Sequence, residues 1–353
     1  MPIAWPKPRV IVADVSAVSL TPAQSAGHGA VWGALVGDAA GAVLEFCDGA
    51  PSDRDVAHAL QMPGGGVFGV APGQVTDDGE LAIALAQALA ANGGRYVAST
   101  VSAAYVDWAE SNPFDIGSAC RSAFGHGRTG RALTKMCQQE ALAFNAASQA
   151  NGALMRVTPL AVAAAAWTAQ AAARWAAFDA ALSHPHPICQ QANAAYVLAI
   201  RHLVRAPKDH AGAINASREY LQSVQSEVAH WLHDALHGRL PDAKWQMGFV
   251  RHGFTRAFFH LHQGSSFHAA IGHTLSAGGD TDTNACIVGG LMGAYWGATQ
   301  LLQDELTQGM FKSVMQCDTR QGQSRPHKFH PARMWQHLLQ FKATQLAPPP
   351  ASL

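Results

Sequence analysis

Apolar runs rich in alanine alternate along the chain with short polar segments, and most of these runs are longer than a strand. The runs within 80–92 and 157–182 reach a dozen residues or more, a length typical of buried helices. The pattern predicts helices over 26–46, 80–92, 97–110, 115–123, 130–147, 157–182, 188–205, 210–235, 246–261, 266–275 and 283–303. Only residues 9–12 favour a strand.

Proline and glycine separate the apolar runs and mark the expected loops. These loops lie at 62–74, 111–114, 124–130, 183–187 and 276–279. Because neither a repeat nor a long linker divides the chain, we expect one all-α domain. The chain ends in a basic tail, which carries Lys312, Arg320, Arg325, Lys328, Arg333 and Lys342 against Asp318. We interpret this tail as a solvated segment, with a nucleic-acid partner as the alternative.

The composition narrows the class of protein. The 353 residues are 48% hydrophobic and 14% charged, with a formal net charge of zero. No basic field therefore favours nucleic acid or an anionic membrane. The apolar runs at 157–173 and 285–302 are marginal in length for a bilayer, and we interpret them as buried helices. The six scattered cysteines and the absence of a secretory pattern predict buried thiols and a cytoplasmic location.

Acidic residues interrupt the apolar pattern in unusual places. Asp38 and Glu45 lie seven positions apart in the first predicted helix, so both can project from one face. Asp77 and Asp78 follow Thr76 and directly precede an apolar run. Carboxylates are rarely buried without a partner, and no lysine or arginine is near in sequence.

A second cluster repeats this arrangement late in the chain. Asp280 and Asp282 alternate with threonines directly before another apolar helix. Helix capping would explain one acid in each cluster, but not two. Beyond the second cluster, small residues recur every four positions at Gly289, Gly293 and Gly297, which would allow another helix to approach closely.

The two clusters predict one shared metal site. Four carboxylates brought together repel strongly, so divalent cations are the expected counterions. A ligand set built from oxygen favours Mg²⁺, Mn²⁺ or Ca²⁺ over Zn²⁺. A second candidate ligand set is formed by His230, His233 and His237, which share one helical face. We interpret that set as an exposed histidine-rich face rather than a Zn²⁺ site.

Several motifs, in this order, resemble the ADP-ribosylglycohydrolase family. They are 33-GALVGDAAGAVLEF-46, 63-PGGGVFGVAPGQVTDDGE-80, 114-FDIG-117, 151-NGALMRVTPLA-161, 184-HP-185 and 278-GGDTDTNACIVGGLMGAYWG-297. The resemblance implies a compact all-α catalytic domain over 27–310, between an N-terminal extension (1–26) and the C-terminal tail (311–353). It also implies a cleft that holds two divalent cations, Mg²⁺ or Mn²⁺.

The resemblance further implies roles for single residues. Metal ligands would be Thr76, Asp77, Asp78, Asp280, Asp282 and Thr283, and the catalytic residues would be Glu45, Asp77 and Asp282. Substrate would be bound by Asp115, Gly117, Asn151, Gly152, Met155 and His184, with backbone N–H groups of Gly64, Gly65 and Gly66 offered to the pyrophosphate. Gly79 stands where family members often have threonine, which would alter a contact behind the ligands.

These expectations describe a metal-dependent hydrolase that removes ADP-ribose from a modified acceptor. It would cleave the bond at the anomeric carbon through an oxocarbenium-like state, with Glu45 or a metal-bound aspartate as general base. The acceptor would be a protein side chain, a small molecule or a nucleic acid, the last only as a modified substrate. Two alternatives stay open: a non-catalytic relative that binds ADP-ribose or is structural, and a metal-dependent phosphohydrolase.

Overall fold

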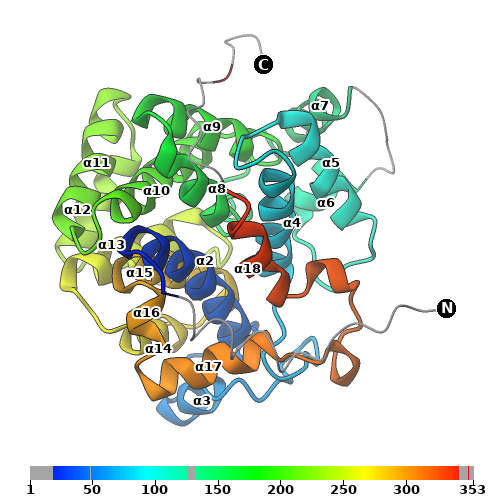
Figure 1. Cartoon of the computed structure of the whole chain (residues 1–353), viewed down its shortest axis with the longest axis vertical. Coiled ribbons are helices and arrows are strands. Elements are labelled where there is room, and N and C mark those ends of the chain that lie inside the picture. The colour runs from blue at the N-terminus through cyan, green and yellow to red at the C-terminus, as the bar shows by residue number, and fades with distance from the viewer. Residues whose placement is uncertain (1–18, 48, 126–131, 342–348, 350–353) are drawn as a thin grey trace.

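Helices supply nearly all the regular structure of the chain (Figure 1). The structure is a computed structural model that describes residues 19–47, 49–125, 132–341 and 349. Its helices are α2 (Pro22–Gly41), α3 (Asp53–Ala59), α4 (Asp77–Ala91), α5 (Ala98–Ala109), α6 (Ser118–Phe124), α7 (Leu133–Asn145), α8 (Thr158–Ala163), α9 (Ala169–Ala181), α10 (Pro187–Arg205), α11 (His210–Ser223), α12 (Val228–Leu236), α13 (Val250–Gln263), α14 (Phe267–Ser276), α15 (Thr281–Trp296), α16 (Ala298–Leu301), α17 (Glu305–Met315) and α18 (Ala332–Leu338). Three 3-10 turns are η1 (Ala164–Ala166), η2 (Thr319–Gln321) and η3 (His327–Phe329). Among these described residues the only β pairing is two isolated bridges, which confirms the all-α class.

Two long helices, α2 and α15, pack against each other at the centre of the molecule (Figure 1). Their contact surface is made of glycines, as the stripe in the sequence predicted. A Cβ atom added to Gly289 would lie 2.0 Å from the carbonyl oxygen of Gly33, and one added to Gly293 would lie 2.0 Å from that of Gly29. Gly297 ends α15 with a φ of 75° and also lies against α2, because a Cβ atom added to Gly29 would lie 2.9 Å from its Cα. The two backbones are therefore close enough to bring the residues at their ends together.

Two predicted helices are interrupted by short non-helical breaks. The run 157–182 forms α8, η1 and α9, because Trp167 adopts an extended conformation and Thr168 caps α9. The Arg201 guanidinium on α10 donates to the Trp167 carbonyl, 2.5 Å from Nη2. The run 210–235 likewise divides into α11 and α12, where Gln225 has a φ of 51°.

Other sequence predictions also need correction. The first predicted helix ends at Gly41 rather than at residue 46, so Glu45 lies in the turn that follows. The short helix α3 was not predicted. The strand predicted at 9–12 and part of the loop at 124–130 lie outside the described residues. Five cysteines are buried free thiols, as expected, but Cys47 is exposed.

The C-terminal segment packs onto the core, so its interpretation as a solvated tail was wrong for the described part. Phe311 on α17 and Trp335 on α18 are 4% and 7% exposed. Their rings lie 4.4 and 5.3 Å, centroid to centroid, from that of Trp32 on α2. The Arg325 side chain is 4% exposed and forms an ion pair with Glu80 of α4. The domain boundaries at 26 and 310 stay a prediction.

The apolar runs at 157–173 and 285–302 belong to the packed interior. The first supplies α8, η1 and the start of α9, and the second supplies most of α15 and all of α16. None of the described helices has the length and hydropathy needed to span a bilayer. The interpretation of both runs as buried helices is therefore confirmed.

Candidate functional site

The two acidic clusters meet at the N-termini of α4 and α15. The Thr76 hydroxyl lies 3.3 Å from Asp282 Oδ2, although 206 positions separate the two residues. The Thr283 hydroxyl lies 3.2 Å from Asp78 Oδ2 in the same way. The sequence predicted this convergence. The helix α2 produces it, because it packs closely against α15 and its Asp38 binds the first turn of α4.

The carboxylates form two overlapping groups, each suited to a cation. One oxygen from each of Asp38, Asp78 and Asp282 lies within 4.8 Å of the others, and so does one from each of Glu45, Asp280 and Asp282. Asp282 belongs to both groups, as a ligand that bridges two ions would. Two buried oxygens, Asp78 Oδ1 and Glu45 Oε2, have no hydrogen-bond donor. All-oxygen donors with unused lone pairs fit hard divalent cations such as Mg²⁺ or Mn²⁺.

Asp38 was noted in the sequence but given no role, and the structure places it in the first carboxylate group, where it also supports the turn that carries Thr76 and Asp78. Its carboxylate accepts hydrogen bonds from the backbone N–H groups of Thr76 (3.0 Å) and Gly79 (2.8 Å), and from the Thr76 hydroxyl (2.9 Å). Neither Thr76 nor Asp280 caps its own helix with its side chain. Simple capping by these residues is therefore excluded, and Asp38 from α2 caps α4 instead.

The same contact explains Gly79. A Cβ atom at this position would lie 2.6 Å from Asp38 Oδ2 and 2.7 Å from the Cβ of Val75. Threonine does not fit there without displacing Asp38. The glycine therefore belongs to the way in which α2 supports the first turn of α4, and it removes no ligand.

Burial and mutual repulsion make the carboxylates hard to ionise in the metal-free fold. Burial raises the pKa of Asp38 to about 7, and burial together with repulsion by Asp280 raises the pKa of Glu45 to about 8. Burial chiefly raises the pKa values of Asp77, Asp78 and Asp282 well above their usual range. Bound cations would reverse these shifts, because they stabilise the ionised form.

A cavity of about 740 Å³ opens above the clusters. The predicted site residues among its walls are Glu45, Asp77, Asp115, Gly117, Asn151, Gly152, Met155, His184, Asp280, Asp282 and Thr283. Thr76 and Asp78 are fully buried and lie behind the residues that line the cavity. Asp115 lies on the loop before α6, where burial and repulsion by Glu45 raise its pKa to about 7. Within the described chain, no lysine or arginine lines the cavity.

The cavity wall formed by Gly152 and His184 is supported from behind by a buried arginine, Arg156, which the sequence analysis missed. Arg156 Nη1 donates to the carbonyl of Gly152 (3.0 Å) and to the hydroxyl of Ser183 (2.9 Å), and Nε pairs with Asp179. The Ser183 hydroxyl lies 2.8 Å from His184 Nδ1. Burial, helped by Arg156, lowers the pKa of His184 to about 3, so its ring is neutral. Arg156 lies within a quoted motif, but only the fold places it behind the wall that Gly152 and His184 form.

Two other predicted sets lie away from the cavity walls. Gly64, Gly65 and Gly66 form a turn whose Gly65 N–H bonds to the Val70 carbonyl, and none of the three lines the cavity. Their contact with a pyrophosphate stays a prediction. The histidines at 230, 233 and 237 are exposed, as interpreted, and form no metal-binding group in the described part of the chain.

Comparisons with known proteins agree with this geometry. The sequence profile of the ADP-ribosylglycohydrolase family matches residues 20–324. The chain is 26% identical to the ADP-ribosyl-[dinitrogen reductase] glycohydrolase of Rhodospirillum rubrum, over 77% of this chain and 86% of that protein. It is 27% identical to an ADP-ribosylarginine hydrolase of Pseudomonas putida, over 80% of this chain and 74% of that protein.

A solved structure shares the fold. It is a chain of an ADP-ribosylglycohydrolase-related protein complex, which superposes with a TM-score of 0.63 at 23% identity and covers 84% of this chain and 99% of its own. The family profile spans both acidic clusters, the Asp115 loop and the walls of the cavity. On this evidence the chain belongs to the ADP-ribosylglycohydrolase family.

Proposed function

We propose that this protein is a metal-dependent hydrolase that releases ADP-ribose from a modified acceptor. The observation that carries the proposal is the meeting of two acidic clusters, about two hundred positions apart, at the floor of a large cavity. A purely structural protein gains nothing from so many buried carboxylates, which destabilise the fold when no cation is bound.

The residues that would hold the cations are Thr76, Asp77, Asp78, Asp280, Asp282 and Thr283. When bound, two Mg²⁺ or Mn²⁺ ions supply positive charge that orients the ribose hydroxyls and lowers the pKa of a water molecule. Asp38 orients the first turn of α4 through three hydrogen bonds. Asn151 donates to Asp280 Oδ2 at 2.7 Å and orients the second cluster from the opposite wall.

Glu45 is the proposed general base. It lies in a turn at the cavity wall, and its Oε2 atom has no hydrogen-bond donor, so this oxygen is free to accept a proton from water. Asp77 and Asp282 are the proposed catalytic partners, because both combine a place in the cavity wall with one in the clusters. Cleavage at the anomeric carbon develops positive charge on the ribose, which the surrounding carboxylates stabilise.

The remaining walls suit the rest of an ADP-ribosyl group. Asp115 and Gly117 lie on the loop before α6, where the Gly117 N–H is 3.3 Å from Asp77 Oδ2 and close to where ribose and phosphates would lie. Gly152, Met155 and the neutral His184 form the wall proposed for the adenosine. Backbone N–H groups, rather than lysine or arginine, would bind the pyrophosphate.

The acceptor of the ADP-ribosyl group is the part of the substrate that experiment must identify. The two named relatives act on modified dinitrogen reductase and on ADP-ribosylarginine, and identities of 26% and 27% leave the acceptor of this chain open. The decisive experiment measures release of ADP-ribose from a panel of substrates that differ only in the linkage, with Mg²⁺ or Mn²⁺ present. We expect release from at least one substrate and its loss in Asp282→Asn.

A control variant and the products of the assay distinguish this proposal from its alternatives. Asp318→Asn removes a half-buried aspartate that pairs with the nearby Arg320, and it should keep full activity. Full activity in Asp282→Asn would reject the ligand assignment. Binding of ADP-ribose without release from any substrate would favour the non-catalytic alternative, and production of AMP would favour a phosphohydrolase.

A further inference from the structure

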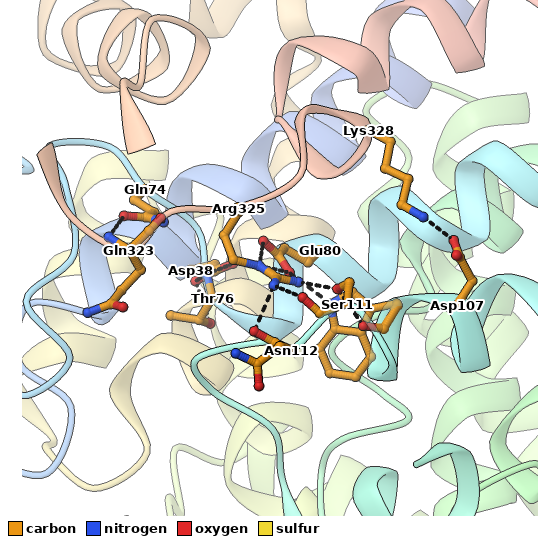
Figure 2. A network of polar contacts seen from close by, with 11 residues as sticks. Asp38, Gln74, Thr76, Glu80, Asp107, Ser111, Asn112, Gln323, Arg325 and Lys328 are labelled. Carbon is orange, nitrogen blue, oxygen red and sulfur yellow. Dashed lines mark hydrogen bonds and ion pairs between the residues drawn. The ribbon is translucent and has the colours of Figure 1, made fainter. Parts of the chain in front are cut away.

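The C-terminal segment crosses the back of the acidic site. Residues 322–325, here called the C-terminal clasp, run between η2 and η3 past the first turn of α4 (Figure 2). The clasp contacts three parts of the chain that build the site: the glycine-rich loop at 63–74, the start of α4, and the loop at 111–117. The family profile ends at residue 324, so it does not include Arg325.

Arg325 is the centre of these contacts. Its Nε and Nη2 atoms donate to the Glu80 carboxylate at 2.8 and 2.7 Å, and Nη2 also donates to the Ser111 hydroxyl at 2.7 Å. Its Nη1 atom donates to the carbonyls of Ser111 (2.8 Å) and Asn112 (3.0 Å). All five guanidinium N–H donors are therefore used, a geometry that only the planar fork of arginine provides.

The ion pair joins two halves of the site. Glu80 lies one turn after Asp77 on α4, and its other hydrogen bond comes from Trp108 Nε1 at 2.8 Å. Asn112 lies three residues before Asp115, which lines the cavity. Arg325 therefore connects the first turn of α4 to the segment that leads to Asp115, and it does not itself line the cavity.

Gln323 makes a second connection, to the loop before Thr76. Its backbone N–H donates to Gln74 Oε1 at 3.0 Å, and Gln74 Nε2 donates back to the Gln323 carbonyl at 2.6 Å. The Gln323 side chain also donates to the carbonyl of Phe68. Next to it, a Cβ atom on Gly322 would lie 2.0 Å from the Ala71 nitrogen, so the clasp backbone lies directly against this loop.

We propose that Arg325 and Gln323 are positioning residues, which fix the Thr76–Asp78 ligands and the Asp115 loop in the geometry that binds cations. The proposal rests on the proposed function for the identity of the site. Its physical basis is that a buried ion pair fixes its two partners only while both remain, since an unpaired buried charge is strongly destabilising. Groups behind metal ligands tune metal affinity in the same way.

The test measures Mn²⁺ binding to metal-free protein, by the electron paramagnetic resonance signal of the free ion, alongside the melting temperature. We expect Arg325→Ala to raise the Kd for Mn²⁺ about tenfold or more. Arg325→Lys keeps a charge opposite Glu80 but loses the fork. We expect it to recover most of the melting temperature and only part of the affinity, a separation that a purely structural role would not produce.

The matched control is Arg320→Ala, which removes an arginine in the same segment whose ion pair with Asp318 is exposed. It should leave the Kd for Mn²⁺ unchanged. If Arg325→Ala does not fold, Arg325→Lys and Gln323→Ala decide the question. A Kd within about twofold of the wild type in the folded variants would overturn the proposal.

The clasp and the proposed function can fail separately. If the wild type releases ADP-ribose and the clasp variants bind Mn²⁺ as tightly as it does, only the clasp proposal fails. If the clasp variants lose Mn²⁺ affinity but the wild type releases no ADP-ribose from any substrate, the clasp stands and the hydrolase assignment fails.

Discussion

At the scale of single residues, the site depends on how Asp38 is packed. This carboxylate is fully buried, yet it accepts three hydrogen bonds from the turn that presents Thr76 and Asp78. Gly79 leaves the space that Asp38 occupies. Gly79, which has no side chain, is therefore needed for Asp38 to position the proposed ligands Thr76 and Asp78.

Gly79→Ala tests this packing. The added methyl group would overlap Asp38 Oδ2 and the Val75 side chain, so we expect a loss of about 2 kcal/mol in unfolding free energy and weaker Mn²⁺ binding. Chemical denaturation and a metal titration measure the two effects. Gly309→Ala is the control, because nothing lies within 4 Å of its Cβ position on α17. Equal stability of Gly79→Ala and the wild type would show that Asp38 is not held as described.

The meeting of the two acidic clusters could be predicted from the sequence, because each cluster has more acids before an apolar helix than capping needs. Asp280 and Asp282 alternate with threonines, a pattern that simple capping does not explain. Asp38 and Arg156 could not be assigned in the same way. Their roles come from contacts with residues 38 and 27 positions away, at Thr76 and Ser183, which no local pattern encodes.

At the scale of helices, the glycine contact between α2 and α15 holds Asp38, which supports the first cluster, next to Asp282 of the second cluster. A Cβ atom on Gly41 would lie 2.3 Å from the Cα of Asp282, so the end of α2 touches the second cluster directly. The four-residue spacing of glycines in α15 predicted a close helix neighbour, but it did not identify α2 as that neighbour. The turn after Gly41 then places Glu45 beside Asp280 and Asp282.

Helix breaks were among the features of the secondary structure that the sequence did not predict. The alanine-rich run at 157–182 has no proline or glycine near Trp167, so periodicity alone favours one continuous helix. The break is stabilised by Arg201 of α10, which donates to the carbonyls of Ala164 and Trp167. Tertiary contacts therefore override the local preference.

At the scale of the whole molecule, the C-terminal segment closes the back of the site. Its basic composition suggested solvation, but Arg325 pairs with Glu80, 245 positions earlier, and Lys328 pairs with Asp107. Charge composition cannot distinguish a solvated arginine from one whose partner is distant in sequence. The all-α class was predictable because it needs only periodicity, whereas the position of this segment needs the assembled core.

The buried carboxylates also determine how stability depends on pH and metal. In the metal-free fold the pKa values of Asp38 and Glu45 are raised to about 7 and 8, above their values of roughly 4 in an unfolded chain. At pH values between the unfolded and the folded pKa of each carboxyl group, the folded state binds more protons than the unfolded state. The unfolding free energy therefore falls as pH rises through this interval.

We expect the melting temperature of metal-free protein to fall between about pH 7 and pH 8, where most histidines of the unfolded chain are already neutral. Mn²⁺ should raise the melting temperature more at the higher pH, because its ligands bind it in the ionised form. Differential scanning calorimetry with and without a chelator measures both effects. Asp38→Asn should reduce the slope. A melting temperature of metal-free protein that rises across this range would be inconsistent with buried, uncompensated carboxylates.

The most direct test of the central claim is an anomalous difference map from crystals of the Mn²⁺-loaded protein. The account predicts two manganese peaks roughly 3.5–4 Å apart, one near Asp78 and one near Asp280, with Asp282 between them. Both peaks should weaken or vanish in Asp282→Asn. A map with no peak at these carboxylates, or with manganese bound only elsewhere, would contradict the claim that the two clusters form one metal centre.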